Sequence, residues 1–299
     1  LDNGDWLRID TTPSLEAAPL NLPAAIGHTE IYNVDYAIYP LRKLARDLRL
    51  IFFQRFTNGH WQKESTELDD KHGARYTVQG RFPRIWWGDM RQARDGSLLA
   101  VTYPTIPDKA PYTFGSASYR STDRGRTWRL RGRIPHTMDA QADPHAAKRA
   151  GFSEPAFDIL PNGELYAVLR TTDGHGIGPM YETRSRDQGK TWTRPRVFAP
   201  NGVMPRLLRL DNGVLVLSSG RPGVQLRVSR AGDGRHWTEP LDLIQNIDAT
   251  RPQADTCGYT DLIALNRDEF LIVYSWFKYD SEKGAPRKAI LARRIRVTP

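Results

Sequence analysis

The chain contains very little cysteine: Cys257 is the single cysteine among 299 residues. One cysteine cannot form a disulfide within the chain, and no spacing of cysteine, histidine and carboxylate residues matches a zinc site. The glycines of the segment 174–178 lack the flanking strand and helix patterns of a dinucleotide fingerprint. We therefore expect no disulfide, no metal and no cofactor.

Long hydrophobic runs are also absent. No apolar run approaches the roughly 18–20 residues that cross a bilayer, so we expect no membrane span. The first residues have neither a basic start nor an apolar segment, and the chain begins at Leu1 rather than at methionine. We accordingly expect an extracellular or periplasmic protein whose signal peptide has been removed.

Charge is unbalanced but dispersed. The chain has 43 lysine and arginine residues against 34 aspartate and glutamate residues, a formal net charge of +9. Such an excess favours acidic partners, but the arginines are scattered and form no dense block of the kind that follows a phosphate backbone. The sequence therefore favours an acidic glycan over nucleic acid as the partner, and it says nothing about the oligomeric state.

Helical periodicity is nearly absent, and two repeated patterns take its place. The first is a tight turn followed by a β-rich run, at Asp95-Gly96, Asn162-Gly163 and Asn212-Gly213, with a fourth run at 267–274. Asp-Gly and Asn-Gly supply the positive φ angles of short hairpins. Each pattern therefore predicts two antiparallel strands joined by a turn.

The second pattern is a box that reads Ser-x-Asp-x-Gly-x-Thr-Trp at 121–128 and 185–192, with a degraded copy at 229–237. In such a box the aspartate accepts bonds from turn amides, the glycine takes the left-handed conformation, and the tryptophan packs under the turn. The order strand, turn, strand, loop, strand, box, strand predicts a four-stranded antiparallel blade. We expect one all-β domain over 1–299, a six-bladed β-propeller in which the strand 289–297 closes the ring with the N-terminus.

These boxes, placed between blade strands, resemble those of the sialidase superfamily, whose members are six-bladed propellers. The box marks the fold, so we assign scaffold roles to Asp123, Asp187 and Asp233. The resemblance implies a site with three arginines that hold a substrate carboxylate, a tyrosine activated by a glutamate, and an acid that protonates the leaving oxygen.

Three segments are similar to the stretches that carry this site in the family. Glu154 begins one strand and Arg170 ends the next, and the Asn-Gly hairpin between them predicts that both lie at one blade end. Arg221 lies eight residues before the serine of the third box, which suggests the second clamp, and Tyr259 lies in a segment like that of the nucleophilic tyrosine. The resemblance implies that Glu154 is the base of Tyr259.

The first part of the site departs from the family pattern. Family members have Arg-Ile-Pro shortly before the first Asp-Gly turn. Here Arg84-Ile-Trp86 precedes Asp95-Gly96 by a slightly different number of residues and lacks the proline, yet Arg84 is our candidate for the first clamp. Asp108, in the loop before the first box, is the candidate acid. We add His175, in a glycine-rich loop after Arg170, and Trp87, whose ring offers a flat face to a sugar.

Together these residues predict an exo-acting glycoside hydrolase of sialidase type, which releases a terminal acidic sugar with retention through a tyrosine nucleophile. Two alternatives remain open. One is a polysaccharide lyase or exo-hydrolase acting at a uronic-acid linkage, for example rhamnose-glucuronate, with His175 and Tyr259 as base and acid. The other is a glycan-binding propeller without catalytic activity.

Overall fold

A computed structural model describes residues 1–10, 13–31, 33–84, 86–171, 178–244, 248, 250–251, 253–280 and 284–298. Almost all regular structure in this part of the chain is β-strand, as predicted. Three short 3₁₀ helices complete it: η1 (Leu41–Lys43), η2 (Arg46–Arg49) and η3 (Ala146–Lys148). None of the described helices is long and apolar enough to cross a membrane.

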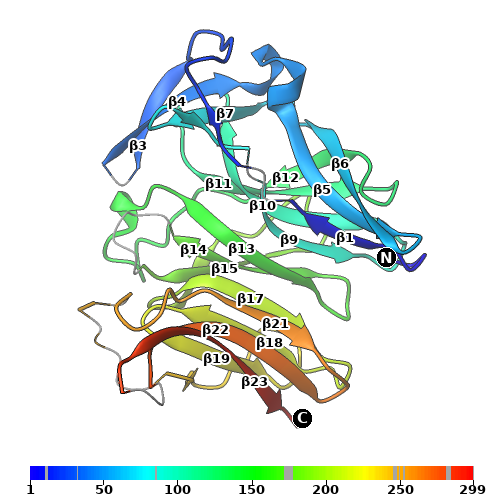
Figure 1. Ribbon diagram of the computed structural model, residues 1–299, viewed down its shortest axis with the longest axis vertical. Coiled ribbons are helices and arrows are strands. Elements are labelled where there is room, and N and C mark those ends of the chain that lie inside the picture. Colours follow the sequence, from blue (N-terminus) through cyan, green and yellow to red (C-terminus); the bar gives the residue numbers. More distant parts are fainter. Residues whose placement is uncertain are drawn as a thin grey trace.

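Three groups of four antiparallel strands form the middle of the molecule (Figure 1). Within each group, every strand pairs with the next one along the chain. The strands are β9 (Trp87–Gln92), β10 (Leu98–Pro107), β11 (Gly115–Ser121) and β12 (Trp128–Arg133); β13 (Phe152–Ile159), β14 (Leu165–Thr171), β15 (Met180–Ser185) and β16 (Arg196–Ala199); and β17 (Val203–Arg209), β18 (Leu215–Gly220), β19 (Val224–Ser229) and β20 (Leu241–Asp242). These are the four-stranded antiparallel blades of a propeller.

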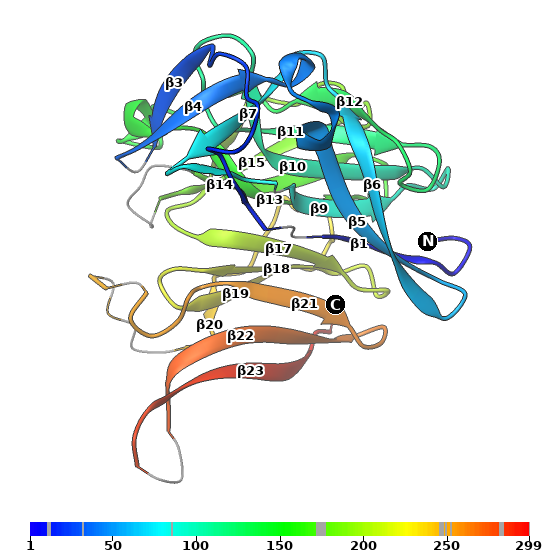
Figure 2. The same cartoon turned by 45° about the horizontal axis from the view of Figure 1, so that its top comes forward.

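The last sheet has three strands, β21 (Thr260–Ala264), β22 (Glu269–Tyr279) and β23 (Arg287–Arg296). Figure 2 shows the strand groups following one another in the order of the sequence. Among the described residues β23 pairs with β22, whereas the N-terminal strand β1 (Trp6–Ile9) pairs with β5 (Leu50–Thr57). The prediction that the last strand closes the ring by pairing with the N-terminus was therefore wrong.

The first 86 residues build two irregular strand groups. In the first, β5 pairs with β1 and with β6 (His60–Asp69), and β6 runs parallel to β12. The second contains β2 (Leu15–Glu16), β3 (Gly27–Ile31), β4 (Val34–Pro40), β7 (Gly73–Val78) and β8 (Arg81–Phe82), and β7 pairs with the end of β10. These links join both groups to the blade β9–β12 in one twelve-stranded sheet. The N-terminal groups therefore do not repeat the regular blade.

The core lies between successive sheets. Strands in the middle of the molecule are buried on both faces, as in β14, where Leu165, Ala167 and Leu169 pack on one side and Tyr166 and Val168 on the other. Such strands carry continuous apolar runs rather than alternating ones. The hairpin turns before them have the predicted glycine conformation, with φ of 79° at Gly96, 84° at Gly163 and 91° at Gly213.

The boxes are turn scaffolds, as predicted. In the second box, Asp187 accepts hydrogen bonds from the Thr191 amide at 2.9 Å, the Thr191 hydroxyl at 2.6 Å and the Ser185 hydroxyl at 2.9 Å. Gly189 has a φ of 85°, and Trp192 is buried. In the first box, Asp123 accepts the equivalent hydrogen bonds from Thr127 and Ser121.

Each box also bonds to the strand group before it. A carbonyl of the box accepts a hydrogen bond from a side chain of that preceding group: Arg55 to Arg124 at 2.7 Å, Ser118 to Gly189 at 2.6 Å, and Arg184 to Gly234 at 2.8 Å. The box therefore joins neighbouring strand groups in addition to closing its own turn.

Candidate functional site

The first strands of two neighbouring blades begin with an unusual backbone. Glu154 in β13 and Met204 in β17 both have a φ of 45°, and both are followed by proline. The strand pairing is interrupted at each, between Ser153 and Ala156 and between Val203 and Arg206. Left-handed backbone at residues other than glycine costs on the order of 1–3 kcal/mol and concentrates at functional sites. Glu154 and Met204 therefore lie outside the regular strand pairing of their blades.

Two of the predicted residues, Tyr259 and Arg170, donate hydrogen bonds to the carboxylate of a third, Glu154. Tyr259 donates its hydroxyl proton to Glu154 Oε1 at 2.5 Å, and Arg170 Nη1 donates to the same oxygen at 2.8 Å. The other oxygen, Oε2, accepts the backbone amide of Met204 at 2.8 Å. Glu154 and Arg170 are well enclosed, with side chains 3% and 11% exposed. The carboxylate is therefore oriented by a cation, a phenol and an amide from three different sheets and loops.

Arg221 completes the cluster. Its guanidinium lies 5.6 Å from the centroid of the Tyr259 ring and donates two bonds of 3.2 Å to the carbonyl of Cys257. The backbone beside it is closely packed, because a Cβ added at Gly220 would lie 1.8 Å from the carbonyl oxygen of Gly258. The end of β18 therefore positions both Arg221 and the segment that carries Tyr259.

The ionisation of Tyr259 is tuned by these neighbours. Burial and then the Glu154 carboxylate raise the pKa of Tyr259 to about 12, while Arg170 and Arg221 act in the opposite direction. Tyr259 is therefore neutral at physiological pH and hydrogen-bonded to an acceptor for its proton. This is the arrangement of a nucleophile activated by an adjacent base.

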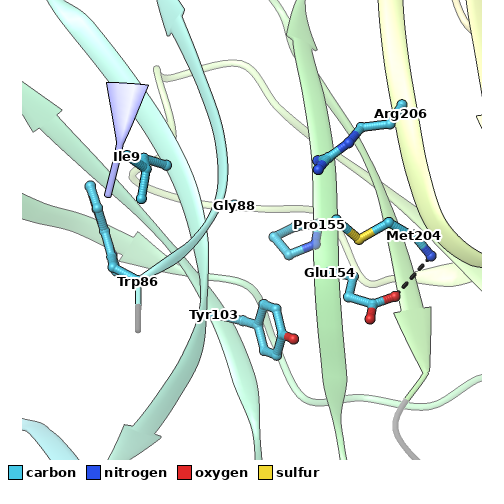
Figure 3. A pocket seen from close by; sticks show the side chains of 8 residues that line it. All are labelled: Ile9, Trp86, Gly88, Tyr103, Glu154, Pro155, Met204 and Arg206. Carbon is cyan, nitrogen blue, oxygen red and sulfur yellow. Dashed lines mark hydrogen bonds between the residues drawn. The ribbon is translucent and has the colours of Figure 1, made fainter. Parts of the chain in front are cut away.

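A cavity of about 210 Å³ lies beside Glu154, as Figure 3 shows. It is mostly apolar, with Tyr103, Glu154 and Arg206 as its polar side chains, and is lined by Ile9, Trp86, Gly88, Tyr103, Glu154, Pro155, Met204 and Arg206. Ile9, Gly88 and Arg206 also line a second cavity of about 590 Å³, which is richer in charged side chains. The two cavities are thus neighbours and share part of their walls.

Two predicted residues do not join the cluster. The Arg84 guanidinium stacks on Phe52 at 4.1 Å, and burial lowers its pKa. Asp108 forms an ion pair with Arg42, lies 3.8 Å from His72 Nδ1, and is not among the residues that line the cavity beside Glu154. These contacts give no support to Arg84 as a clamp or to Asp108 as the acid at this cluster.

Two further predictions fall outside what the structure describes. His175 lies in the segment 172–177, and the side chain of Trp87 is likewise not described. Both remain predictions. The neighbouring Trp86 is 4% exposed and packs against Phe53 and Trp128, so it belongs to the core as well as to the cavity wall.

Tyr103 was not among the residues predicted from the sequence. This residue lies in β10 and lines the cavity with Glu154. A signal was present, because Tyr103 follows Gly96 by seven residues, as Arg170 follows Gly163. Both therefore lie at the same level of the second strand of their blades, where the family-like pattern had drawn attention only to the arginine.

Residues 45–272 match the family model described as BNR repeat-like domain. No curated protein matches the sequence. A solved structure of a protein of unknown function from Dyadobacter fermentans DSM 18053 is similar at 20% identity, with a TM-score of 0.61, over 91% of this chain and 75% of that one.

Two solved sialidases are also similar. The Hadza microbial sialidase Hz136 shares 15% identity over 82% of this chain and 48% of its own, with a TM-score of 0.50. A mutant of the NanB sialidase from Streptococcus pneumoniae shares 17% identity over 78% of this chain and 33% of its own, with a TM-score of 0.51. The chain spans less than half the length of either sialidase, and at these identities the similarity shows the fold alone.

Proposed function

We propose that this chain is an exo-acting glycoside hydrolase of sialidase type. It belongs to the family of BNR repeat-like domains and carries a tyrosine that is hydrogen-bonded to a glutamate. The substrate is a glycan that ends in an acidic sugar, sialic acid or a related sugar acid. The sugar is released with retention of configuration at the anomeric carbon.

The hydrogen bond of 2.5 Å from Tyr259 to Glu154 carries this proposal. Glu154 takes the phenolic proton as Tyr259 attacks the anomeric carbon, which forms a covalent glycosyl-tyrosine intermediate that water then hydrolyses. A neutral nucleophile suits an anionic sugar, because a carboxylate in its place would be repelled by the substrate's own charge.

Two arginines support an acidic sugar as the substrate. Guanidinium groups match carboxylate oxygens in bidentate geometry, and both Arg170 and Arg221 adjoin the Tyr259–Glu154 pair. They also favour the tyrosinate that develops as the proton moves to Glu154. The same two cations thus serve substrate binding and activation of the nucleophile.

The proposal is tested by a substrate screen. The purified protein is incubated with 4-methylumbelliferyl α-N-acetylneuraminide, 4-methylumbelliferyl β-glucuronide and oligosaccharides ending in either sugar, and the products are identified by mass spectrometry and NMR. We expect release of one free acidic sugar with its anomeric configuration retained. Tyr259→Phe is the control: it should fold as the wild type does and release none, and full activity in this variant would overturn the mechanism.

A second candidate is elimination at a uronic-acid linkage by the same cluster. It is favoured by one observation: of the three arginines predicted to hold the carboxylate, Arg84 stacks on Phe52 instead. A lyase needs the carboxylate neutralised and a base and an acid beside it, with His175 and Tyr259 in these roles. An unsaturated product that absorbs in the ultraviolet distinguishes elimination from hydrolysis in the same screen, and binding without any product indicates a glycan-binding propeller.

A further inference from the structure

The proposed hydrolysis requires a proton donor for the leaving oxygen. Of the residues that the structure describes around the cavity, Glu154 is the one with a carboxyl group, and its oxygens are engaged by Tyr259, Arg170 and the Met204 amide. Asp108 is paired with Arg42 instead. A different hydroxyl or acid must therefore supply this proton.

Tyr103 lies where such a donor is needed. Its ring forms part of the cavity wall, and Figure 3 shows its hydroxyl directed towards the side of the cavity that holds Glu154. In the blade it occupies the level that Arg170 occupies in the next blade, which places it at the same end of the sheets as Glu154 and Tyr259. Its electrostatic interactions include Glu154, Tyr259 and Arg170 themselves, together with Tyr76.

We propose that Tyr103 is the acid–base residue of this site and works in place of a carboxylic acid. This inference rests on the proposed function, since it assigns one step of the same reaction.

The step balances as follows in bonds and protons. As Tyr259 forms its bond to the anomeric carbon, the glycosidic C–O bond breaks, and its electron pair passes to the leaving oxygen. That oxygen takes the proton of Tyr103, while Glu154 holds the proton of Tyr259. In the second half, the Tyr103 phenolate removes a proton from the attacking water, and Tyr259 leaves the sugar and recovers its proton from Glu154.

The electrostatics of the cluster change in the direction that this step needs. In the resting site, Tyr259 is neutral, and burial and then the negative charge of Glu154 raise the pKa of Tyr103, so its hydroxyl keeps its proton. During attack, Glu154 becomes a neutral acid, and the Tyr259 oxygen becomes an ether. The negative charge of Glu154 is then absent, and Arg170, which lowers the pKa of Tyr103, remains. Tyr103 becomes a stronger acid when the leaving oxygen requires the proton.

Leaving-group dependence tests this role. The wild type and Tyr103→Phe are compared on two substrates that share the acidic sugar accepted in the screen, a 4-methylumbelliferyl glycoside and a glycoside of lactose. An aryl oxide departs without protonation, whereas a sugar alkoxide does not. We expect kcat/KM of Y103F to fall about 100-fold or more on the lactose glycoside, which is the range that general acid catalysis contributes. On the aryl glycoside, which needs no proton donor, it should fall by less than about threefold.

Tyr166→Phe is the matched control. Tyr166 also has a buried ring, which stacks on Trp237, but it neither lines the cavity nor shifts the pKa of Tyr103. It should leave both substrates unaffected. Equal losses on both substrates in Y103F, or no loss on either, overturn the assignment while the hydrolase stands. A wild type that cleaves neither substrate overturns the hydrolase and this assignment with it.

Discussion

Tyr259 and Glu154 are separated by 105 positions in the chain, and the phenol of one donates a bond of 2.5 Å to the carboxylate of the other. The pair joins the strand β13 to the segment before β21, two strand groups that lie on either side of the sheet β17–β20. The proposed chemistry depends on this one contact, so the substitutions most informative for it are those that alter one partner at a time.

Glu154→Gln should lower kcat about 10²–10⁴-fold with a small change in KM, because the amide has nearly the size of the carboxylate but accepts no proton from Tyr259. The measurement is steady-state kinetics on the substrate found in the screen. A variant with near wild-type kcat would exclude Glu154 as the base.

Arg170→Met and Arg221→Met should differ in their effects on stability. Removing Arg170 leaves the enclosed Glu154 carboxylate without its cation, a loss of about 3–5 kcal/mol in the free energy of unfolding for a broken buried pair. Arg221 bonds to the neutral carbonyl of Cys257, so its loss should cost about 1 kcal/mol. Both should raise KM for the acidic sugar. Chemical denaturation distinguishes the two variants, and equal losses of stability would contradict this view of the cluster.

Gly220→Ala should reduce activity through the position of Tyr259. The added methyl group would lie 1.8 Å from the carbonyl oxygen of Gly258, so the backbone that carries Tyr259 must move. Gly163→Ala is the control, because a methyl group there meets nothing within 4 Å, although the φ of 84° makes it unfavourable. Kinetics and melting temperatures together should show lost activity in the first variant and lost stability alone in the second.

Asp187→Asn should lower the melting temperature without changing specific activity. The hydroxyl and amide of Thr191 and the hydroxyl of Ser185 hold the pKa of Asp187 at about 2, below its usual 3.8. Because the pKa is lower in the folded than in the unfolded protein, the ionised carboxylate stabilises the fold at pH values above its unfolded pKa. This stabilisation is lost as the pH falls from about 4 to 2. The difference in Tm from the wild type should therefore be about 2–4 °C at neutral pH and shrink towards pH 2. A difference independent of pH would contradict the charge-based part of this role.

Asp108→Asn should retain turnover on both aryl and sugar leaving groups, since Asp108 is held by Arg42. The same two substrates used for Tyr103 provide the measurement. A selective loss on the sugar leaving group would restore Asp108 as the acid of the reaction.

The sequence predicted the part of the site that short hairpins determine. Glu154 and Arg170 are the ends of two strands joined by a tight turn, so counting from Asn162-Gly163 was enough to bring them together. Tyr259 followed from the resemblance of its segment to the family stretch that carries the nucleophilic tyrosine. Tyr103 was not predicted because the family resemblance implies an arginine at this level of the strand. Tyr103 occupies the level that Arg170 occupies in the next blade, but it is a tyrosine.

The rest depended on contacts that local patterns do not encode. Arg84 and Asp108 take their partners, Phe52 and Arg42, from the irregular N-terminal strand groups. Those groups contain no box, and their pairing joins strands far apart in the chain, such as β6 with β12. The alternating pattern of the last strand likewise does not specify its neighbour. The sequence therefore did not show that β23 pairs with β22 and not with the N-terminal strand.

Each box has a carbonyl that accepts a hydrogen bond from the strand group before it, from Arg55, Ser118 or Arg184. A blade copied by gene duplication therefore carries the box carbonyl that bonds to the preceding blade. It also carries the side chain that donates a hydrogen bond to the box of the following blade. Such a chain can change its number of blades without a new interface being invented each time. The box is in this sense a heritable connector, and it leaves the residues at the ends of the strands free to diverge in chemistry.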